Sequence, residues 1–545
     1  MTALEVQQQT KDLIDRLKST TNNNGLGNSG HEYTVIVETF LYKFLNDKFV
    51  YQAKLERPEI ADAEDPYKAL LDMSEDDYEE LCDEMMDTVI LEKEHLLPYL
   101  SSRQNEDNFA KIFDATLEGI AKKNESFFFI QDDGNAHISI IHPISDLISG
   151  SSVKKNAFCK SLIGDISAFS FEKVFDAGYD FFSTIFEYLL KDYNSNGGGT
   201  YAEYYTPHSV AQIIAKLLVG DNPNLKSMTC YDPAAGTGTL VIALAHAIGE
   251  QKCSVYTQDI SDKSSTMMML NLILNGMSHS LTNVIKGNTL SHPFHKDGEK
   301  LKQFDYVVSN PPFKLDFSDY QSDLKNDPNK GRFFAGIPNI PKTKKQSMEI
   351  YLCFLQHVLY SIKDGGKGAI VVPTGFLTAQ SGIAQKIKQY LVDNRFLKGV
   401  ISMPSNIFAN TGTNVSVVFI DKTALTDNAV LIDASKLGET IKDGKNQKTV
   451  LNTDDINKII EAFAGWNKAI DDFSVNVKYD EIKDKNYSLS AGQYFEIKIE
   501  YVELTQEEFN QKIADYTSKL DELFKEGNSL EAEIKKSLGE LKYEA

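Results

Sequence analysis

The segment best suited to chemistry is the tetrapeptide Asn310-Pro311-Pro312-Phe313, which follows an apolar run typical of a buried strand. Two prolines cannot continue a sheet and they restrict the backbone, so the turn after the strand is stiff. The amide oxygen of Asn310 and the Pro311 carbonyl can accept both protons of a planar NH2 group, while Phe313 stacks on its ring. Taken alone, the tetrapeptide could also be a strand-ending turn with a packed phenylalanine.

A second motif, Asp232-Pro-Ala234-Ala-Gly236-Thr-Gly238-Thr239, lies where a predicted strand turns into a predicted helix. Glycines there let a ligand approach the backbone at the electropositive end of the helix. A dinucleotide site is the alternative, because an acidic residue follows about twenty residues later. However, Val241 replaces the third glycine of that fingerprint, and Asp232 suits a cation better than a pyrophosphate. The motif therefore favours S-adenosylmethionine, which carries an amine and a sulfonium.

Two further strand ends carry polar residues. Asp259 ends the next predicted strand, where its carboxylate can accept both ribose hydroxyls or cap the helix near Ser261. Asn288 follows Gly287 and offers a polar side chain to an adenine edge, although Gly-Asn is also a common turn. His292 and His295 lack an acidic or thiol companion motif, so loop histidines are expected rather than metal ligands, and no metal is predicted.

The composition is that of an ordinary globular protein of more than one domain, with 545 residues, 42% hydrophobic and 25% charged. The start of the chain lacks an apolar signal-peptide core, and no apolar run could span a membrane, so a cytoplasmic location is expected. Five scattered cysteines without a CxxC pair indicate reduced thiols.

The net charge of −22 opposes DNA binding by the chain alone, because neutralisation of phosphates supplies most non-specific affinity. Either nucleic acid is not the substrate, or another subunit supplies the positive surface. Local charge leaves room for the second option. Residues 314–347 carry seven cations against four aspartates, namely Lys314, Lys325, Lys330, Arg332, Lys342, Lys344 and Lys345.

Strands and helices alternate from about residue 200 to 435, which predicts an α/β fold with a doubly wound sheet. The predicted strands are 228–231, 254–258, 306–309, 368–372, 398–403 and 415–420. The predicted helices between them are 209–218, 239–248, 264–274, 348–361 and 382–393. Upstream, helices are expected at 35–49, 76–90, 108–121 and 177–190, with a hairpin around Asp133-Gly134 and a flexible connector at 194–199.

We predict three regions: a mainly helical domain at 1–165, a catalytic domain at 166–478 and a helical C-terminal segment at 479–545. The tail is expected to be helical from Thr505, with a capping box to Glu508. Apolar residues recur there with a seven-residue period that Gly527 and Ser537 weaken, so the tail resembles a coiled coil. Packing on its own domain is possible; docking on a partner is favoured.

These motifs match a known family. The ordered set YAEYYTP, DPAAGTGTL, QDI, GNTL, NPPF, GGKGAIVVPTGFL and MPSNIFANTGTNVSVVFI resembles the modification (M) subunits of type I restriction–modification systems. Those subunits are gamma-class N6-adenine DNA methyltransferases, with a Rossmann-like S-adenosylmethionine-dependent domain. The resemblance covers roughly residues 181 to 420, and Asn486-Tyr487-Ser488-Leu489 with Tyr494 extends it weakly.

The resemblance implies roles for individual residues. The residues that match the family's cofactor contacts are Tyr204, Thr206, Asp232, Ala234, Gly236, Gly238, Thr239, Asp259, Asn288 and Asn310. The target-base contacts match Asn310, Pro311, Pro312 and Phe313. Asn288 departs from the family, whose members usually carry aspartate there, so altered cofactor affinity is expected rather than lost activity.

The expected function is site-specific methylation of adenine N6 in double-stranded DNA, with the target sequence read by a separate specificity (S) subunit. The resemblance implies a second M subunit and an optional restriction (R) subunit, a helical N-terminal region that closes around DNA, and C-terminal helices that pack on the specificity subunit. Adenine is favoured over cytosine because cytosine enzymes usually begin the motif with serine. The alternatives are a stand-alone N6-adenine methyltransferase, an enzyme acting on protein glutamine or on guanine N2 of ribosomal RNA, and a catalytically silent scaffold.

Overall fold

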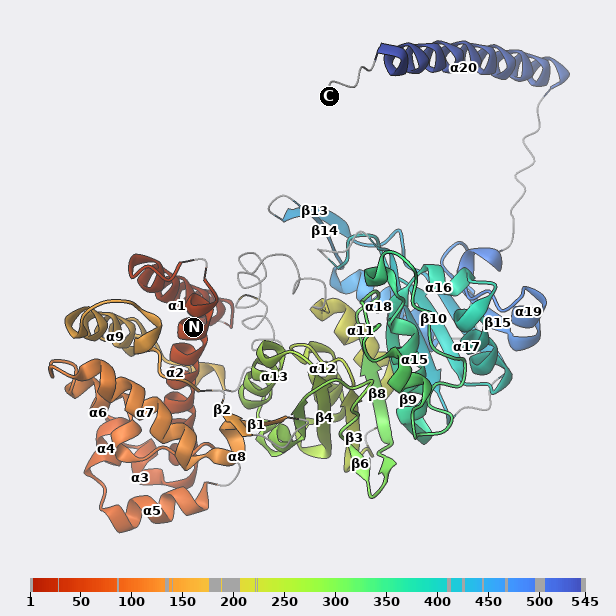
Figure 1. Cartoon of the computed structure of the whole chain (residues 1–545). Helices are drawn as coiled ribbons and strands as arrows, with labels where there is room; N and C mark the ends of the chain where they lie inside the picture. The colour runs from red at the N-terminus through yellow and green to blue at the C-terminus, as the bar shows by residue number, and fades with distance from the viewer. Residues whose placement is uncertain are drawn as a thin grey trace. The chain divides into compact units, whose positions relative to one another are not determined.

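A computed structural model gives the fold of the chain (Figure 1). It describes residues 3–27, 29–85, 88–132, 137–139, 141–175, 188, 206–220, 222, 224–408, 413–423, 427–443, 446–465, 469–495 and 505–540. The chain divides into two compact units, 1–495 and 496–545, which are described separately. The predicted helix at 177–190, apart from Tyr188, and the predicted connector at 194–199 lie outside the described residues.

The N-terminal region is helical, as the sequence predicts. Its longer helices are α1 (Ala3–Asn23), α2 (Gly30–Glu56), α5 (Glu75–Glu84), α7 (Phe109–Lys123) and α9 (Ser152–Ser167), and its shorter ones α3 (Pro58–Ala61), α4 (Pro66–Asp72), α6 (Leu97–Ser102) and α8 (Glu125–Phe128). Local sequence sets several starts. The Ser29 side chain caps α2 by accepting from Glu32 N, and Ser74 caps α5 by accepting from Asp77 N.

The centre of the first unit is an eleven-stranded sheet of order β15-β12-β10-β11-β9-β8-β3-β4-β5-β1-β2. Its strands are β1 (Phe129–Asp132), β2 (His137–Ser139), β3 (Met228–Asp232), β4 (Cys253–Asp259), β5 (Val284–Lys286), β8 (Phe304–Ser309), β9 (Ile362–Pro373), β10 (Leu397–Ser402), β11 (Val415–Asp421), β12 (Asn428–Asp433) and β15 (Ser474–Lys478). All six predicted strands are present. The predicted strand ranges omit β12, β15 and β5, although the polar signal at Gly287-Asn288 marks the end of β5.

The sheet is mostly parallel at its centre. Strands β5, β4, β3, β8 and β9 are parallel neighbours, whereas β11 runs antiparallel between β9 and β10. Small hairpins lie outside the sheet, β6 (Lys296–Asp297) with β7 (Lys300–Leu301) and β13 (Glu439–Asp443) with β14 (Asn446–Val450). This arrangement confirms the predicted doubly wound α/β fold.

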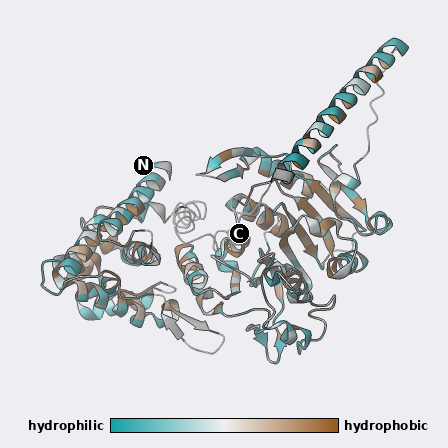
Figure 2. Ribbon diagram, turned by 45° about the horizontal axis from the view of Figure 1, so that its top comes forward, coloured by the Kyte–Doolittle hydropathy of each residue, from teal (hydrophilic) through white to brown (hydrophobic). Residues whose placement is uncertain are grey.

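Helices cover both faces of the sheet. One face packs with α11 (His208–Val219), α12 (Thr239–Ile248), α13 (Asp262–Leu274) and α18 (Thr453–Ala464); the other packs with α15 (Tyr351–Ser361), α17 (Gly382–Asp393) and α19 (Tyr479–Asp484). Two short helices, α14 (Gln321–Lys325) and α16 (Gly375–Thr378), lie in connections. Neighbouring strand residues enter opposite cores, Val308 on the first face and Val307 on the second. Strands buried on both faces read as continuous apolar runs, and Figure 2 shows the central strands coloured mainly as hydrophobic.

The predicted hairpin also joins the central sheet, which the sequence did not indicate. Strands β1 and β2 pair antiparallel, and β1 also pairs in parallel with β5, with Gln131 opposite Ile285. Residues of the helical region thus extend the sheet of the catalytic region. The division at 165 and 166 remains a proposal. The same holds for the boundary at 478 and 479, since residues 479–495 belong to the first compact unit.

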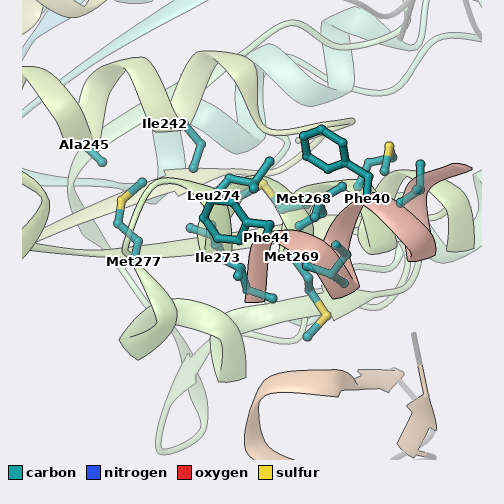
Figure 3. Packing of buried hydrophobic residues seen from close by; sticks show 14 of the residues in the cluster. Phe40, Phe44, Ile242, Ala245, Met268, Met269, Ile273, Leu274 and Met277 are labelled. Carbon is teal, nitrogen blue, oxygen red and sulfur yellow. The ribbon is translucent and has the colours of Figure 1, made fainter. Parts of the chain in front are cut away.

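The N-terminal helices share a hydrophobic core with one face of the sheet (Figure 3). Phe40 and Phe44 of α2 lie beside Met268 and Met269 of α13. The Tyr33 hydroxyl also contacts the sulfur of Met267 on the same helix. Methionine side chains are flexible and fill irregular gaps, so three in succession suit a joint between two differently shaped layers.

The second unit contains α20 (Gln506–Glu540). The predicted capping box is present, since Thr505 N donates to Glu508 Oε2 at 2.9 Å and Glu508 N donates to Thr505 Oγ1 at 3.3 Å. Its apolar side chains are exposed, namely Phe509, Ile513, Tyr516, Leu520, Leu523, Phe524, Leu530 and Ile534. Leu541 lies outside the described residues. None of the described helices combines the length and the apolar character needed to cross a membrane.

Truncation of Phe44 tests the shared core. Phe44 is 2% exposed and makes edge contacts with Phe171 and Phe175, so F44A should destabilise the chain by about 3–5 kcal/mol. L55A is the matched control, because Leu55 lies on the same helix and is 63% exposed. Chemical unfolding should show a large decrease in the free energy of unfolding for F44A and almost none for L55A. Equal decreases in the two variants would contradict a core shared between the helices and the sheet.

Candidate active site

The two principal sequence motifs end neighbouring strands. Asp232 is the last residue of β3 and Asn310 directly follows the last residue of β8, and Tyr231 pairs with Val307 in the parallel ladder between these strands. The next strand along the chain after β3, β4, lies on the other side of β3, so the connections diverge at this position. Open α/β sheets bind ligands at such a point, outside the carboxyl ends of the strands.

Asp232 is a buried carboxyl group, 1% exposed. Burial raises its pKa to about 7, with a further contribution from the charge of Asp259, while the hydrogen bond from Ala234 opposes the shift. The Ala234 amide donates to Asp232 Oδ1 at 3.0 Å. An acidic group whose ionisation is held back in this way gains stability from a cationic neighbour.

The glycine loop between β3 and α12 has the backbone that its glycines permit. Gly236 has φ +52° and Gly238 has φ +84°, and Gly238 is the N-cap of α12. A Cβ atom at position 238 would lie 1.9 Å from the Met268 sulfur, so a larger residue there would also displace the Met268 side chain. Thr239 is buried, with its hydroxyl 3.3 Å from that of Thr237.

Asp259 connects the second strand end to this loop. Its Oδ2 accepts from Gly236 N at 2.9 Å and its Oδ1 accepts from Ser261 N at 2.9 Å, and burial raises its pKa. The cap of α13 is Ser261, which accepts from Ser264 N, so capping of this helix falls to the serine rather than to Asp259. Each carboxylate oxygen accepts a single backbone N–H, which leaves acceptor capacity for a further donor.

Asn288 has the turn-forming role that its Gly-Asn context suggests. Its Oδ1 accepts from Leu290 N at 3.0 Å and from Ser291 N at 3.3 Å. The next residue, Thr289, donates its hydroxyl to the Pro233 carbonyl at 2.7 Å. This bond fixes the Asn288 turn against the glycine loop. No motif in the sequence indicates the contact between Thr289 and Pro233.

Asn310 is held by a residue from far upstream in the chain. Its Nδ2 donates to Thr206 Oγ1 at 3.1 Å, and Asn310 and Thr206 are 8% and 5% exposed. Thr206 precedes Pro207, the N-cap of α11. Because the amide nitrogen donates to Thr206, the amide oxygen is the group that can accept hydrogen bonds from a ligand. Tyr204 lies outside the described residues.

Phe313 stands beside Asn310 on an aromatic support. Pro311 is buried, while Pro312 and Phe313 are half-buried. The Phe313 ring meets Tyr351 at 6.4 Å between centroids and 80°, and Tyr351 meets Phe376 at 6.3 Å and 87°. These edge-to-face contacts fix the plane of a ring that retains an accessible surface.

Arg332 is buried, so counting it among the exposed cations of residues 314–347 was wrong. Arg332 is 1% exposed and forms an ion pair with Asp327 at 2.7 Å. It also donates to the carbonyls of Thr289 and Leu290, and to His357 Nδ1 at 3.0 Å. His357 Nε2 in turn lies 3.1 Å from the Tyr231 hydroxyl. The residues around Arg332 look like an ordinary surface loop in the sequence, so nothing there signals its burial.

The histidine pair is split between different environments. His295 is half-buried among the rings of Tyr231, Tyr256 and Phe304 and lies 3.0 Å from the Thr257 carbonyl, and burial lowers its pKa to about 4. His292 lies 2.9 Å from the Ser291 hydroxyl. Within the described part of the chain, no group of three or more His, Cys, Asp or Glu side chains could hold a metal ion.

The raised pKa of Asp232 predicts a pH-dependent stability. Its folded-state pKa of about 7 exceeds the ordinary 3.8, so the folded chain holds a proton that the unfolded chain releases. The contribution to stability is full below about pH 4 and is lost as pH rises through about 7. D232N abolishes this titration, so its melting temperature relative to wild type should rise from pH 5 to pH 8. D454N, at an exposed position, should show no such trend. If the difference in melting temperature between D232N and wild type does not change with pH, Asp232 does not have the raised pKa.

Comparison with known proteins identifies the family. The family model described as N-6 DNA methylase matches residues 177–501, more than half of the chain, and the chain belongs to this family. The type I restriction enzyme MpnII methylase subunit of Mycoplasma pneumoniae is 28% identical, over 80% of this chain and 76% of that protein. The HindI methylase subunit of Haemophilus influenzae is 26% identical, over 67% and 79%.

A solved structure shares the fold. The methyltransferase subunit of a type I restriction–modification system from Streptococcus thermophilus superposes with a TM-score of 0.71 at 22% identity, over 91% of this chain and all of that one. Together, the family match and the relatives confirm the predicted resemblance to type I methylase subunits and the predicted adenine-specific DNA methyltransferase activity.

Proposed function

We propose that this N-6 DNA methylase acts as the modification subunit of a type I restriction–modification complex and transfers a methyl group from S-adenosylmethionine to N6 of a flipped adenine. The observation that carries the site assignment is the Asn310–Thr206 hydrogen bond, at the sheet edge that also bears Asp232. It leaves the amide oxygen of Asn310 available as an acceptor at the edge that carries the buried Asp232 carboxyl group. The cytoplasmic location expected from the sequence stays a prediction.

The residues at the carboxyl edge of β3 and β4 fit the cofactor. Asp232, with its ionisation held back by burial, suits the ammonium and sulfonium charges. Asp259 has acceptor capacity for the ribose hydroxyls, and positive-φ glycines let a ligand lie close to the backbone at the start of α12. The Asn288 turn, fixed through Thr289, lies where the adenine edge is expected. The bound cofactor would supply an electrophilic methyl group.

The chain's own residues act mainly by positioning. The N6 lone pair of adenine is delocalised into the ring and is a poor nucleophile. Asn310 Oδ1 and the Pro311 carbonyl would accept hydrogen bonds from the two N6–H groups, draw the nitrogen toward tetrahedral geometry and aim its lone pair at the methyl group. The one proton that N6 loses on methylation would pass to solvent. Extrusion of the base costs a few kcal/mol, and stacking on Phe313 recovers about 1–3 kcal/mol of that cost.

Partner binding is proposed for α20. Its exposed apolar residues lack cover within their own unit and follow a seven-residue period, the pattern of a helix that packs on other helices. A specificity subunit that binds there would read the target sequence and add positive surface to a chain of charge −22. The family resemblance supports a second modification subunit and an optional restriction subunit in the same complex.

Substitutions at Asn310 test the catalytic assignment. N310A should reduce methyl transfer at least a thousandfold while S-adenosylmethionine binding stays within about threefold, because the lost acceptor faces the base. T206V removes only the hydroxyl that orients the amide and should lower kcat by roughly 10–100-fold. Tritiated methyl transfer and cofactor calorimetry measure these effects, and long-read sequencing of host DNA identifies the base and site. Parallel loss of binding and transfer in N310A would show that Asn310 serves mainly the cofactor.

Truncation after Tyr501 tests the docking assignment. Because α20 begins at Gln506, this variant lacks the whole helix and keeps the first compact unit. It should bind S-adenosylmethionine normally and fail to co-purify with the specificity subunit. A complex that survives the truncation would place the interface on the first unit.

A further inference from the structure

We propose that residues 314–347, called the lysine loop below, bind the phosphate backbone of duplex DNA beside Asn310–Phe313, the proposed target-base contacts, called the target-base slot below. This inference rests on the proposed function, because it assigns to this chain a share of the DNA contact.

Both ends of the lysine loop lie at the slot. Lys314 directly follows Phe313, and Leu315 N donates to the Met348 carbonyl at 3.1 Å to close the base of the loop. Helix α15 then begins with Tyr351, whose ring contacts Phe313. A duplex that delivers a base to Phe313 must therefore pass close to the loop.

The loop is an ordered platform, because its underside is packed and hydrogen-bonded. Phe317 and Leu324 belong to a small hydrophobic core with Met348 and Phe354. Gln321 Nε2 donates to the Pro338 carbonyl at 2.7 Å, which ties one half of the loop to the other.

Arg332 anchors the loop from inside. Its bonds to Asp327 and to the carbonyls of Thr289 and Leu290 fasten the middle of the loop to the turn that Thr289 ties to the glycine loop. The exposed side chains of the loop thus have a fixed relation to both halves of the site. This order lowers the entropic cost of binding a rigid duplex.

The exposed side of the loop carries positive charge in an acidic protein. With Arg332 and Asp327 paired internally, the loop exposes six lysines against three other aspartates, namely Lys314, Lys325, Lys330, Lys342, Lys344 and Lys345. None of the six forms a salt bridge with a carboxylate among the residues that the structure describes. Lys342, Lys344 and Lys345 lie within four positions, and Lys345 donates to the neutral Ser318 hydroxyl at 3.2 Å.

Exposed lysines often serve only as a solvated face. Here they flank the proposed target-base slot, on an ordered support, and form no salt bridge with a carboxylate in the described chain. Phosphate oxygens are the partners that such ammonium groups would meet on a duplex.

Salt dependence provides the test. The triple variant K342Q/K344Q/K345Q of the full-length chain, in complex with its specificity subunit, is titrated with a fluorescein-labelled 30-base-pair duplex of arbitrary sequence. Each lost phosphate contact should reduce the slope of log K against log salt by about 0.9, so a reduction of about 2–3 is expected. Affinity at 0.1 M salt should fall roughly tenfold or more, with S-adenosylmethionine binding and melting temperature unchanged.

Two controls separate charge from structure. The charge-preserving variant K342R/K344R/K345R should keep the wild-type slope. The matched variant K216Q/K226Q/K252Q removes three exposed lysines elsewhere, two of them just before the amino ends of β3 and β4, and should also keep it. An equal loss of slope in this second control would show a general charge effect and overturn the proposal.

The outcomes also separate this inference from the proposed function. If K342Q/K344Q/K345Q keeps the wild-type slope and affinity while the wild-type complex methylates DNA, the lysine loop does not bind phosphates. The proposed function would then still hold. Absence of methyl incorporation by the wild-type complex would instead refute the proposed function, and the loop assignment with it.

Discussion

The parallel pairing of β3 with β8 is the constraint on which the site depends. It brings Asp232 and Asn310, far apart in the sequence, to one edge of the sheet. In the proposed function their side chains serve different partners, since a buried carboxyl group favours a cation and an oriented amide favours an NH2 group. The sheet supplies the reaction geometry, and the chain needs little acid–base chemistry of its own.

Around that pair, hydrogen bonds between distant segments fix each group. Thr206 orients the Asn310 amide, Gly236 and Ser261 occupy one acceptor position on each Asp259 oxygen, and Thr289 ties its turn to Pro233. Arg332 then joins the turn to the lysine loop. The cofactor half and the base half of the site therefore share supporting residues.

The sequence predicted those features that depend on residues close together along the chain, such as helix bounds and strand positions. The bounds of α12 and α17 agree with the prediction, and the apolar runs located all the central strands except β5. Three residues give too short an apolar pattern, so only the polar signal at Gly287-Asn288 marked the end of β5. Arg332 was read as a surface cation, since composition cannot show that Asp327 and two carbonyls surround it. The Thr206–Asn310 contact likewise depends on tertiary folding, although both residues lie in motifs that the sequence singled out.

The edge pairing of β1 with β5 has a consequence for synthesis on the ribosome. Gln131 leaves the exit tunnel long before Ile285, its partner in the ladder, so the hairpin must wait with an unpaired edge while the intervening chain is made. Exposed strand edges favour association with other chains. The edge of the hairpin is thus open to pairing with other chains until the third strand of the methyltransferase region is made.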